Sequence, residues 1–165
     1  METLTPFQTV GPYLSLGLRT GVGRLPAGTT GARIVIRGRL VDGARHGISE
    51  GLLEGWTPGF PVVQRTFTEV DGRFSLETTK PALVSIADGR TQAPHFAVRV
   101  LGRGILTHYV TRLYFADEPS NEHDPVLTLV PQHRHKTLLA TPVSPSEYRF
   151  DVVVQGENET VFFDV

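Results

Sequence analysis

Apolar residues recur at every second position in short runs of this chain, and that period of two limits the fold more than any other feature. Ile34, Ile36 and Leu40 alternate with arginines, and residues 96–100 repeat the pattern. Successive side chains of a strand point to opposite faces of a sheet, so this alternation predicts strands with one buried face. Helical periodicity is scarce, and the chain is therefore predicted to be all-β.

Turn-forming residues separate these runs and set the limits of the expected strands. Asp71-Gly72 provides the positive φ that a two-residue hairpin turn requires. Strands are expected at residues 33–40, 52–56, 66–70, 73–78, 96–101, 108–115, 148–154 and 161–164.

Two segments rich in Gly, Thr, Pro and Ser, residues 17–30 and 140–146, are expected to be loops. One short helix is expected at residues 132–139, where Pro131 suits a first helical position. Many short strands with regular turns are typical of a β-sandwich. The sequence predicts a single β-sandwich domain over residues 1–165, with one short helix and an N-terminal arm.

Composition excludes several classes of function. The chain has no cysteine, which excludes a disulfide framework and thiolate metal sites. Its 16 basic and 17 acidic residues form no long block of one sign, so neither nucleic acid nor an acidic membrane surface is an expected partner. No apolar run approaches the roughly 20 residues of a membrane span, and residues 1–18 lack a signal-like pattern. We expect a cytoplasmic protein.

Histidines are the first candidates for chemistry. His133 and His135 could chelate a metal from one face of a strand, but on a helix they would point roughly 200° apart. His95 opens an alternating run and shares its strand face with Ala97 and Arg99, so it could point inward. Without ligand partners at compatible positions, a hydrogen-bonded histidine is the simpler interpretation.

Arg103 and the N-terminal segment are candidates for binding. Arg103 stands between Gly102 and Gly104, where the glycines let the backbone approach another surface and the guanidinium could bind a carboxylate through two hydrogen bonds. A solvated turn arginine would look the same in sequence. Residues 9–13 include a Gly-Pro bend and an aromatic residue, and could either line a pocket or form an ordered arm.

Several segments of this chain follow one another in an order and spacing typical of one protein family. They are Thr5-Pro6-Phe7-Gln8-Thr9-Val10-Gly11-Pro12-Tyr13, Leu53-Glu54-Gly55-Trp56, Thr79-Lys80-Pro81, Ala93-Pro94-His95, Arg103-Gly104-Ile105, and residues 111–118, 148–151, 155–157 and 159–164. In these segments the chain resembles the intradiol dioxygenases, and the C-terminal ones are similar to the alpha chains of two-chain members in particular. Residues 17–30 and the loop after Trp56 are shorter than usual for the family.

The resemblance implies a β-sandwich and raises the question of iron ligands. Catalytic chains of the family hold a ferric ion with two tyrosines and two histidines. In this sequence His95 matches one ligand, but Ala97 stands at the second histidine, Val84 at one tyrosine, and residues 57–64 contain no tyrosine. Ferric iron requires several strong donors. The resemblance therefore implies that this chain binds no metal or cofactor, and that a homologous beta chain holds Fe(III).

By the same resemblance, the chain is the iron-free alpha subunit of a hetero-oligomer of alpha/beta pairs. The reaction it implies is cleavage of 3,4-dihydroxybenzoate by O2 to 3-carboxy-cis,cis-muconate, in aromatic catabolism. Arg103 matches an arginine that binds the substrate carboxylate, and Thr9, Gly11 and Pro12 match a segment lining the partner's pocket.

Two alternatives remain open from sequence alone. The chain could be a stand-alone β-sandwich module for binding or structure that has lost catalysis. It could instead be a metalloenzyme that uses His95, His133 and His135, provided that residues around His133 form a strand near His95. A neighbouring gene encoding a chain with all four iron ligands would favour the enzyme subunit.

Overall fold

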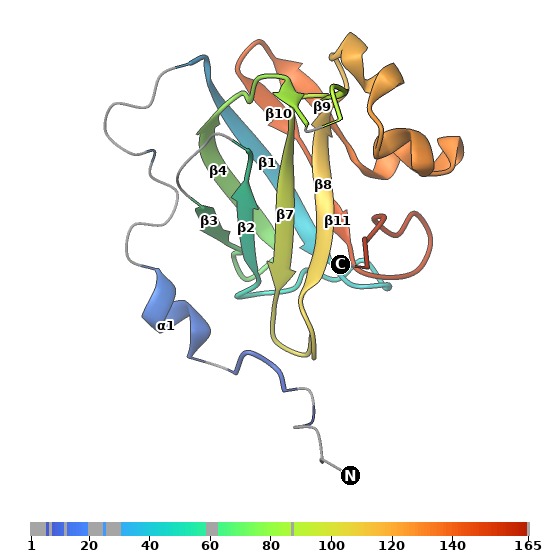
Figure 1. The fold of residues 1–165 in the computed structure, drawn as a ribbon. Helices are drawn as coiled ribbons and strands as arrows, with labels where there is room; N and C mark the ends of the chain where they lie inside the picture. Colours follow the sequence, from blue (N-terminus) through green and yellow to red (C-terminus); the bar gives the residue numbers. More distant parts are fainter. Residues whose placement is uncertain are drawn as a thin grey trace.

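The apolar alternation forms two groups of strands that pack face to face (Figure 1). The computed structural model describes residues 6, 8–11, 13–19, 25, 31–58, 63–86 and 88–164. The strands of the main sheet are β1 (Arg33–Val41), β2 (Leu52–Trp56), β3 (Gln64–Phe67), β4 (Arg73–Thr79), β7 (His95–Leu101), β8 (Tyr109–Phe115), β9 (Leu139–Ser144), β10 (Glu147–Arg149) and β11 (Val152–Val153).

One strand joins the two groups. In the first group β1 lies between β4 and the β10 and β11 segments, and in the second β2 and β7 lie between β3 and β8. Strand β9 runs antiparallel to β10 and parallel to β8, so the sheet continues from one layer to the other. A small separate sheet pairs β5 (Val84–Ser85) with β6 (Thr91–Gln92).

The helical elements are short and lie outside the sandwich. They are α1 (Leu14–Leu18) and the 3-10 helices η1 (Pro119–His123), η2 (Leu127–Leu129) and η3 (Gln132–Thr137). No helix in the described ranges is both long and apolar enough to cross a lipid bilayer.

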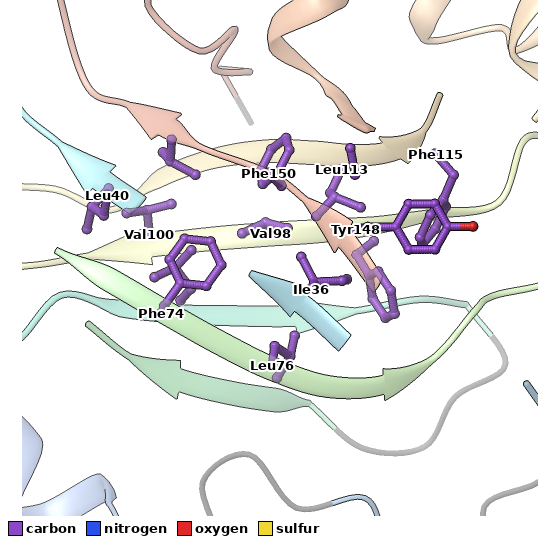
Figure 2. Close-up of a cluster of buried hydrophobic side chains, with 14 of the residues drawn as sticks. Ile36, Leu40, Phe74, Leu76, Val98, Val100, Leu113, Phe115, Tyr148 and Phe150 are labelled. Atoms are coloured by element: carbon purple, nitrogen blue, oxygen red, sulfur yellow. The ribbon is translucent and has the colours of Figure 1, made fainter. Parts of the chain in front are cut away.

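The main core lies between the two strand groups, as Figure 2 shows. Ile36 of β1 and Val98 of β7 project into it from opposite layers, and Phe115 meets Tyr148 edge-on at 4.9 Å between ring centroids. Each of these side chains is almost fully buried, which removes apolar surface from water at roughly 25 cal/mol per Å². The apolar residues that alternate with a period of two thus supply these buried side chains.

Gly38 lets the central strand β1 approach the segment between β10 and β11. A Cβ at this position would lie 1.6 Å from the carbonyl oxygen of Phe150 and 2.9 Å from the ring of Phe74. No side chain can occupy that space without moving backbone. The sequence therefore needs glycine in the middle of this strand.

A second apolar cluster covers the outer face of β8. Tyr114 projects from that face and packs with Leu127, Val130 and Leu138 from the 3-10 region. The C-terminal residues Val161 and Phe163 pack against the same cluster, while Phe162 turns to the main core and stacks on Tyr109.

The prediction of an all-β sandwich with little helix is confirmed, but some elements were predicted wrongly. Residues 140–146 were expected to be a loop, yet Leu139–Ser144 form β9 because β8 and β10 supply partners on both sides. The helix expected at 132–139 is the shorter 3-10 helix η3, with Pro131 before it as N-cap. The loop expected at 17–30 overlaps the end of α1, and most of it lies outside the described residues.

The turn at Asp71-Gly72 differs from the predicted two-residue hairpin. Gly72 N donates to Glu69 O at 2.9 Å and Glu69 N to Arg73 O at 2.7 Å, which closes a three-residue loop with Gly72 at φ +81°. The flanking strands then separate, because β3 pairs with β2 and β4 pairs with β1. The turn connects the two layers of the sandwich.

The C-terminal strands are also more broken than predicted. The strand expected at 148–154 is interrupted at Asp151, whose carboxylate accepts from Arg39 N at 2.9 Å in place of a backbone carbonyl. Residues 161–164 alternate between the two clusters but form no ladder. They are held by single bonds, from Phe163 N to Val110 O at 2.8 Å and from Thr111 Oγ1 to Val161 O at 2.7 Å.

Candidate functional site

Arg103 is at the corner of the turn that joins β7 to β8. Ile105 N donates to Gly102 O at 3.2 Å, and Gly104 has a φ of +84°, as the third residue of a type II turn does. A Cβ on Gly104 would meet no atom within 4 Å, so this glycine is needed for its backbone angle and not for space. Arg103 is exposed at the end of the sandwich, where a ligand or another chain can reach it.

The N-terminal arm lies against the same turn. Thr9 Oγ1 donates to Gly102 O at 3.5 Å, which brings two of the predicted site positions, Thr9 and Arg103, to one end of the molecule. Gly11 bends the arm with a φ of +77°. Pro12 lies outside the described residues, and its predicted role stays a prediction.

A groove of about 390 Å³ is lined by residues of both the arm and the turn. Pro6 and Val10 form one side, and Ile105, Leu106 and His108 belong to the other. Its lining is mainly apolar, so the arm and the turn together offer an apolar surface beside an exposed cation.

His95 is buried on the outer face of β7 and is not free to act as a metal ligand through both ring nitrogens. Its Nδ1–H donates to Ala93 O at 2.7 Å, and its ring lies 5.4 Å from that of Tyr114. Burial lowers the pKa of His95, while the bond to Ala93 acts in the opposite direction. This agrees with the interpretation of a hydrogen-bonded histidine.

The residues at the expected ligand positions do not fit a ferric ion. Ala97 follows His95 on the same face of β7, and Val84 pairs with Gln92 in the β5–β6 sheet, and neither side chain carries a donor atom. Within the described ranges, no group of three or more histidine or carboxylate side chains is placed to hold a metal.

The metalloenzyme alternative fails on the position of the other two histidines. His133 and His135 lie on η3, where residues two apart point to different sides. His135 is engaged through Nε2 with Val130 O at 2.7 Å, and His133 is exposed. The strand near His95 that this alternative required is absent from this part of the chain.

A buried polar network lies beside His95 and is not apparent from the sequence. Asp124 is fully buried and accepts four hydrogen bonds, from Ala93 N at 2.8 Å, Tyr114 OH at 3.0 Å, Val126 N at 2.9 Å and Leu127 N at 2.8 Å. Burial also raises the pKa of the Tyr114 hydroxyl. The sequence around Asp124 reads as an ordinary turn, so only its long-range partners reveal the network.

Lys80, part of the Thr-Lys-Pro segment, links the end of β4 to the residues that follow β8 and to β10. Its Nζ lies 2.6 Å from Glu118 Oε1 and 3.2 Å from Asp117 Oδ2 and from Tyr148 OH. Burial alone would lower the pKa of Lys80, but the bonds to Glu118, Tyr148 and Asp117 outweigh it and raise that pKa above its usual value. The cation therefore stabilises the folded chain.

We expect Lys80→Met to reduce the free energy of unfolding by about 1–3 kcal/mol near neutral pH, because it leaves two carboxylates and a hydroxyl without their cation. A raised folded pKa gives stabilisation that is complete below the unfolded lysine value and is lost as pH rises through the folded value. The difference between wild type and variant should thus be constant from pH 7 to 9 and shrink above the ordinary lysine value of 10.5.

Urea unfolding at pH 7, 9 and 11 measures this difference. Lys136→Met is the matched control, because Lys136 is exposed, and it should change stability little at any pH. A deficit for Lys80→Met that grows with pH would contradict the assignment.

Sequence comparison gives relatives over nearly the whole chain. It is 41% identical to the protocatechuate 3,4-dioxygenase alpha chain of Burkholderia cepacia over 201 aligned positions, covering all of both chains. It is 36% identical to the alpha chain of the Pseudomonas putida enzyme, covering 97% of this chain and 96% of that one. The Burkholderia cepacia beta chain is also similar, with 23% identity over 79% of this chain and 67% of the relative. No family model matches the chain.

Solved structures of intradiol enzymes share the fold. The dioxygenase domain of a dioxygenase and carbohydrate-binding protein fusion from Streptomyces sp. SirexAA-E superimposes with a TM-score of 0.63 and 26% identity, covering 92% of this chain and 98% of that one. A 3-chlorocatechol 1,2-dioxygenase from Rhodococcus opacus gives a TM-score of 0.64 at 19% identity, covering 80% and 62%. By its identity to two alpha chains over nearly full length, the chain belongs to the protocatechuate 3,4-dioxygenase alpha-chain family of intradiol dioxygenases.

Proposed function

We propose that this chain is the iron-free alpha subunit of a protocatechuate 3,4-dioxygenase and is inactive alone. It pairs with a homologous beta chain that holds Fe(III), and the complex cleaves 3,4-dihydroxybenzoate with O2 to 3-carboxy-cis,cis-muconate. The near full-length identity to two alpha chains carries the proposal. The iron-free state is supported by the described residues, in which no group of three or more histidine or carboxylate side chains is placed to hold a metal.

The geometry of the arm and the β7–β8 turn supports a role at the partner's substrate pocket. The substrate is a carboxylate, and Arg103 offers an exposed guanidinium on a turn, which can bind the two carboxylate oxygens together. Thr9 holds the arm beside the turn that carries this cation, and Gly11 bends the arm. The proposed role of Thr9, Gly11 and Pro12 is to line the partner's substrate pocket. The iron chemistry belongs to the partner.

The remaining parts of the proposal concern assembly and place. Alpha/beta pairs associate into a larger hetero-oligomer, without nucleic acid or membrane. The chain works in the cytoplasm as a single β-sandwich domain, in keeping with its lack of cysteine and balanced charge.

Co-expression with the homologous beta chain tests the proposal. We expect a stable complex that contains iron and consumes O2 in the presence of protocatechuate, whereas the purified single chain contains no iron and consumes none. Failure to form a complex, or turnover by the chain alone, would leave the rival of a stand-alone β-sandwich module or a self-sufficient enzyme.

Gly11→Ala tests the arm within that complex. A φ of +77° costs an L-residue about 1–2 kcal/mol, and a Cβ at Gly11 would meet no atom within 4 Å, so the change acts through the backbone angle alone. We expect kcat/KM for protocatechuate to fall by roughly 5- to 30-fold, by the conversion of about 1.4 kcal/mol per tenfold.

The thermal stability of the single chain should be nearly unchanged by the same substitution. Gly17→Ala is the matched control, because a Cβ there also meets no atom within 4 Å and Gly17 has no positive φ. Equal kinetics for the two variants would argue against a role for the bend in the arm.

A further inference from the structure

The outer face of β7 and β8 carries two of the expected metal-ligand positions, His95 and Ala97, and an arginine from β8 lies beside them. His95 and Ala97 lie two apart on β7, so their side chains share one face. Across the ladder, Tyr114 of β8 is opposite His95, and Arg112 is opposite Ala97. These four positions enclose one patch of the sheet.

Arg112 extends along β8 toward Tyr114. Its Nη1 donates to Tyr114 OH at 3.1 Å, and Tyr114 OH donates in turn to Asp124 Oδ1 at 3.0 Å. Because Arg112 starts opposite the small Ala97 and ends at the residue opposite His95, its guanidinium lies across the patch. A second imidazole at position 97 would share this space.

The network of Arg112, Tyr114 and Asp124 already contains one cation and one anion. Asp124 is a fully buried carboxylate whose two oxygens already accept four hydrogen bonds, and Arg112 is the cation linked to it through the Tyr114 hydroxyl. Tyr114 needs its proton to donate to Asp124, so it is not a phenolate that could bind ferric iron. A metal ion at this patch would face a fixed guanidinium of the same sign.

We infer that Arg112 is the resident cation of this patch, and that its guanidinium, held by Tyr114 and Asp124, keeps metal ions out of the space beside His95. The chain then lacks a metal for two separate reasons, the missing donors at Ala97 and Val84 and a positive charge that occupies the position. The inference rests on the proposed function in one respect, the iron-free state of this chain. Its test needs neither the beta chain nor turnover, so either claim can fail alone.

The test creates a pair of histidines, at positions 95 and 97, that can bind a metal ion, and then substitutes Arg112 in that background. Ala97→His in the full chain adds a second imidazole on the face of His95, a spacing suited to one metal ion. Into this background we place Arg112→Met, which removes the charge and keeps the length, Arg112→Gln, which also keeps a donor for Tyr114, and Arg112→Lys, which keeps the charge. Arg99→Met is the matched control, because Arg99 is on the same face but pairs with Glu54 at 3.7 Å.

Co(II) is the probe, followed by its visible absorption and by metal content after desalting, with urea unfolding to show that each variant is folded. We expect Met or Gln at position 112 to strengthen Co(II) binding by at least about tenfold over Ala97→His alone, since a like charge no longer opposes the ion. Lysine at 112 and methionine at 99 should give no gain. Equal Co(II) affinity across the set, whether high or undetectable, overturns the inference, and Arg112→Gln keeps the comparison decisive if Arg112→Met does not fold.

Discussion

Arg103→Ala in the alpha/beta complex should lower kcat/KM for protocatechuate by roughly 30- to 150-fold. A charge-assisted hydrogen bond is worth about 2–3 kcal/mol, and each 1.4 kcal/mol is a factor of ten. Arg103 sits on a turn whose shape depends on the φ of Gly104 and not on its own side chain, so the substitution removes the guanidinium without altering the fold. Steady-state O2 uptake by the purified complex measures the effect.

The substrate comparison separates carboxylate binding from general damage. Catechol lacks the carboxylate, so wild type and Arg103→Ala should turn it over equally well. Arg103→Lys keeps the charge but loses the planar fork, and should recover part of the activity. Arg73→Ala is the matched control, as another exposed turn arginine at a different place in the fold, paired with Asp71 at 3.2 Å. An equal loss on both substrates would refute the proposed contact.

Asp124→Ala should destabilise the chain by about 3–5 kcal/mol, a large part of the 5–15 kcal/mol that holds a typical domain together. The substitution leaves three backbone N–H groups and the Tyr114 hydroxyl without their acceptor in a place that water does not reach. It therefore loosens the junction of β7, β8 and the 3-10 region at once. Urea unfolding at neutral pH gives the free energy directly.

Asp124→Asn tests the contribution of the individual hydrogen bonds to Asp124. Oδ1 accepts three of the four bonds, from Tyr114, Val126 and Leu127, and Oδ2 accepts only Ala93 N. Asparagine with its amide oxygen in the place of Oδ1 still accepts three of the four hydrogen bonds. Its NH2 group then faces only one other donor, Ala93 N, so we expect a smaller loss of stability, about 1–2 kcal/mol. We expect the free energy of unfolding of Asp124→Asn to lie between those of wild type and Asp124→Ala. An Asn variant less stable than the Ala variant would contradict the network.

An exposed aspartate in a similar local role provides the control for both variants. Asp42 accepts from Ala44 N at 2.9 Å and His46 N at 2.8 Å but lies at the surface. Water can replace its bonds, so Asp42→Ala should cost under about 1 kcal/mol.

The strands with a strong period of two were predictable because their burial is one-sided. Residues 52–56 were predicted with the observed limits of β2, and the runs at 96–101 and 108–115 differ from β7 and β8 by one residue at their starts. The turn at Arg103 was equally visible, since glycines on both sides leave few alternatives for the backbone. These features depend on neighbours in the sequence.

Other features depend on residues far away, and no local pattern could reveal them. Strand β9 has the composition of a loop, with Pro142 inside it, and becomes a strand only because β8 and β10 leave it two partners. Asp71-Gly72 has the chemistry of a hairpin, but the strands beside it find other partners. Arg112, which the sequence placed only within a family segment, gains its meaning from Ala97 and Tyr114 across the ladder.

The family resemblance supplied what the residues alone could not. Without it, Arg103 and the arm were separate surface features, and the missing donors at Val84 and Ala97 had no significance. The structure brings Thr9 next to the Arg103 turn. Their joint action on a substrate remains a proposal for the kinetic experiments above.

The pairing of β1 sets the order in which a newly made chain can mature on the ribosome. Its neighbour β4 is synthesised soon after it, but β10 and β11 come late, and contacts such as Arg37 with Glu147 join residues 110 positions apart. Until those last strands emerge, one edge of β1 and the apolar faces of both layers stay uncovered, which makes the growing chain slow to fold and prone to aggregate. We therefore expect shortening of the C-terminus, which removes partners of β1, to lower the yield of folded protein in cells more than shortening of the N-terminal arm does.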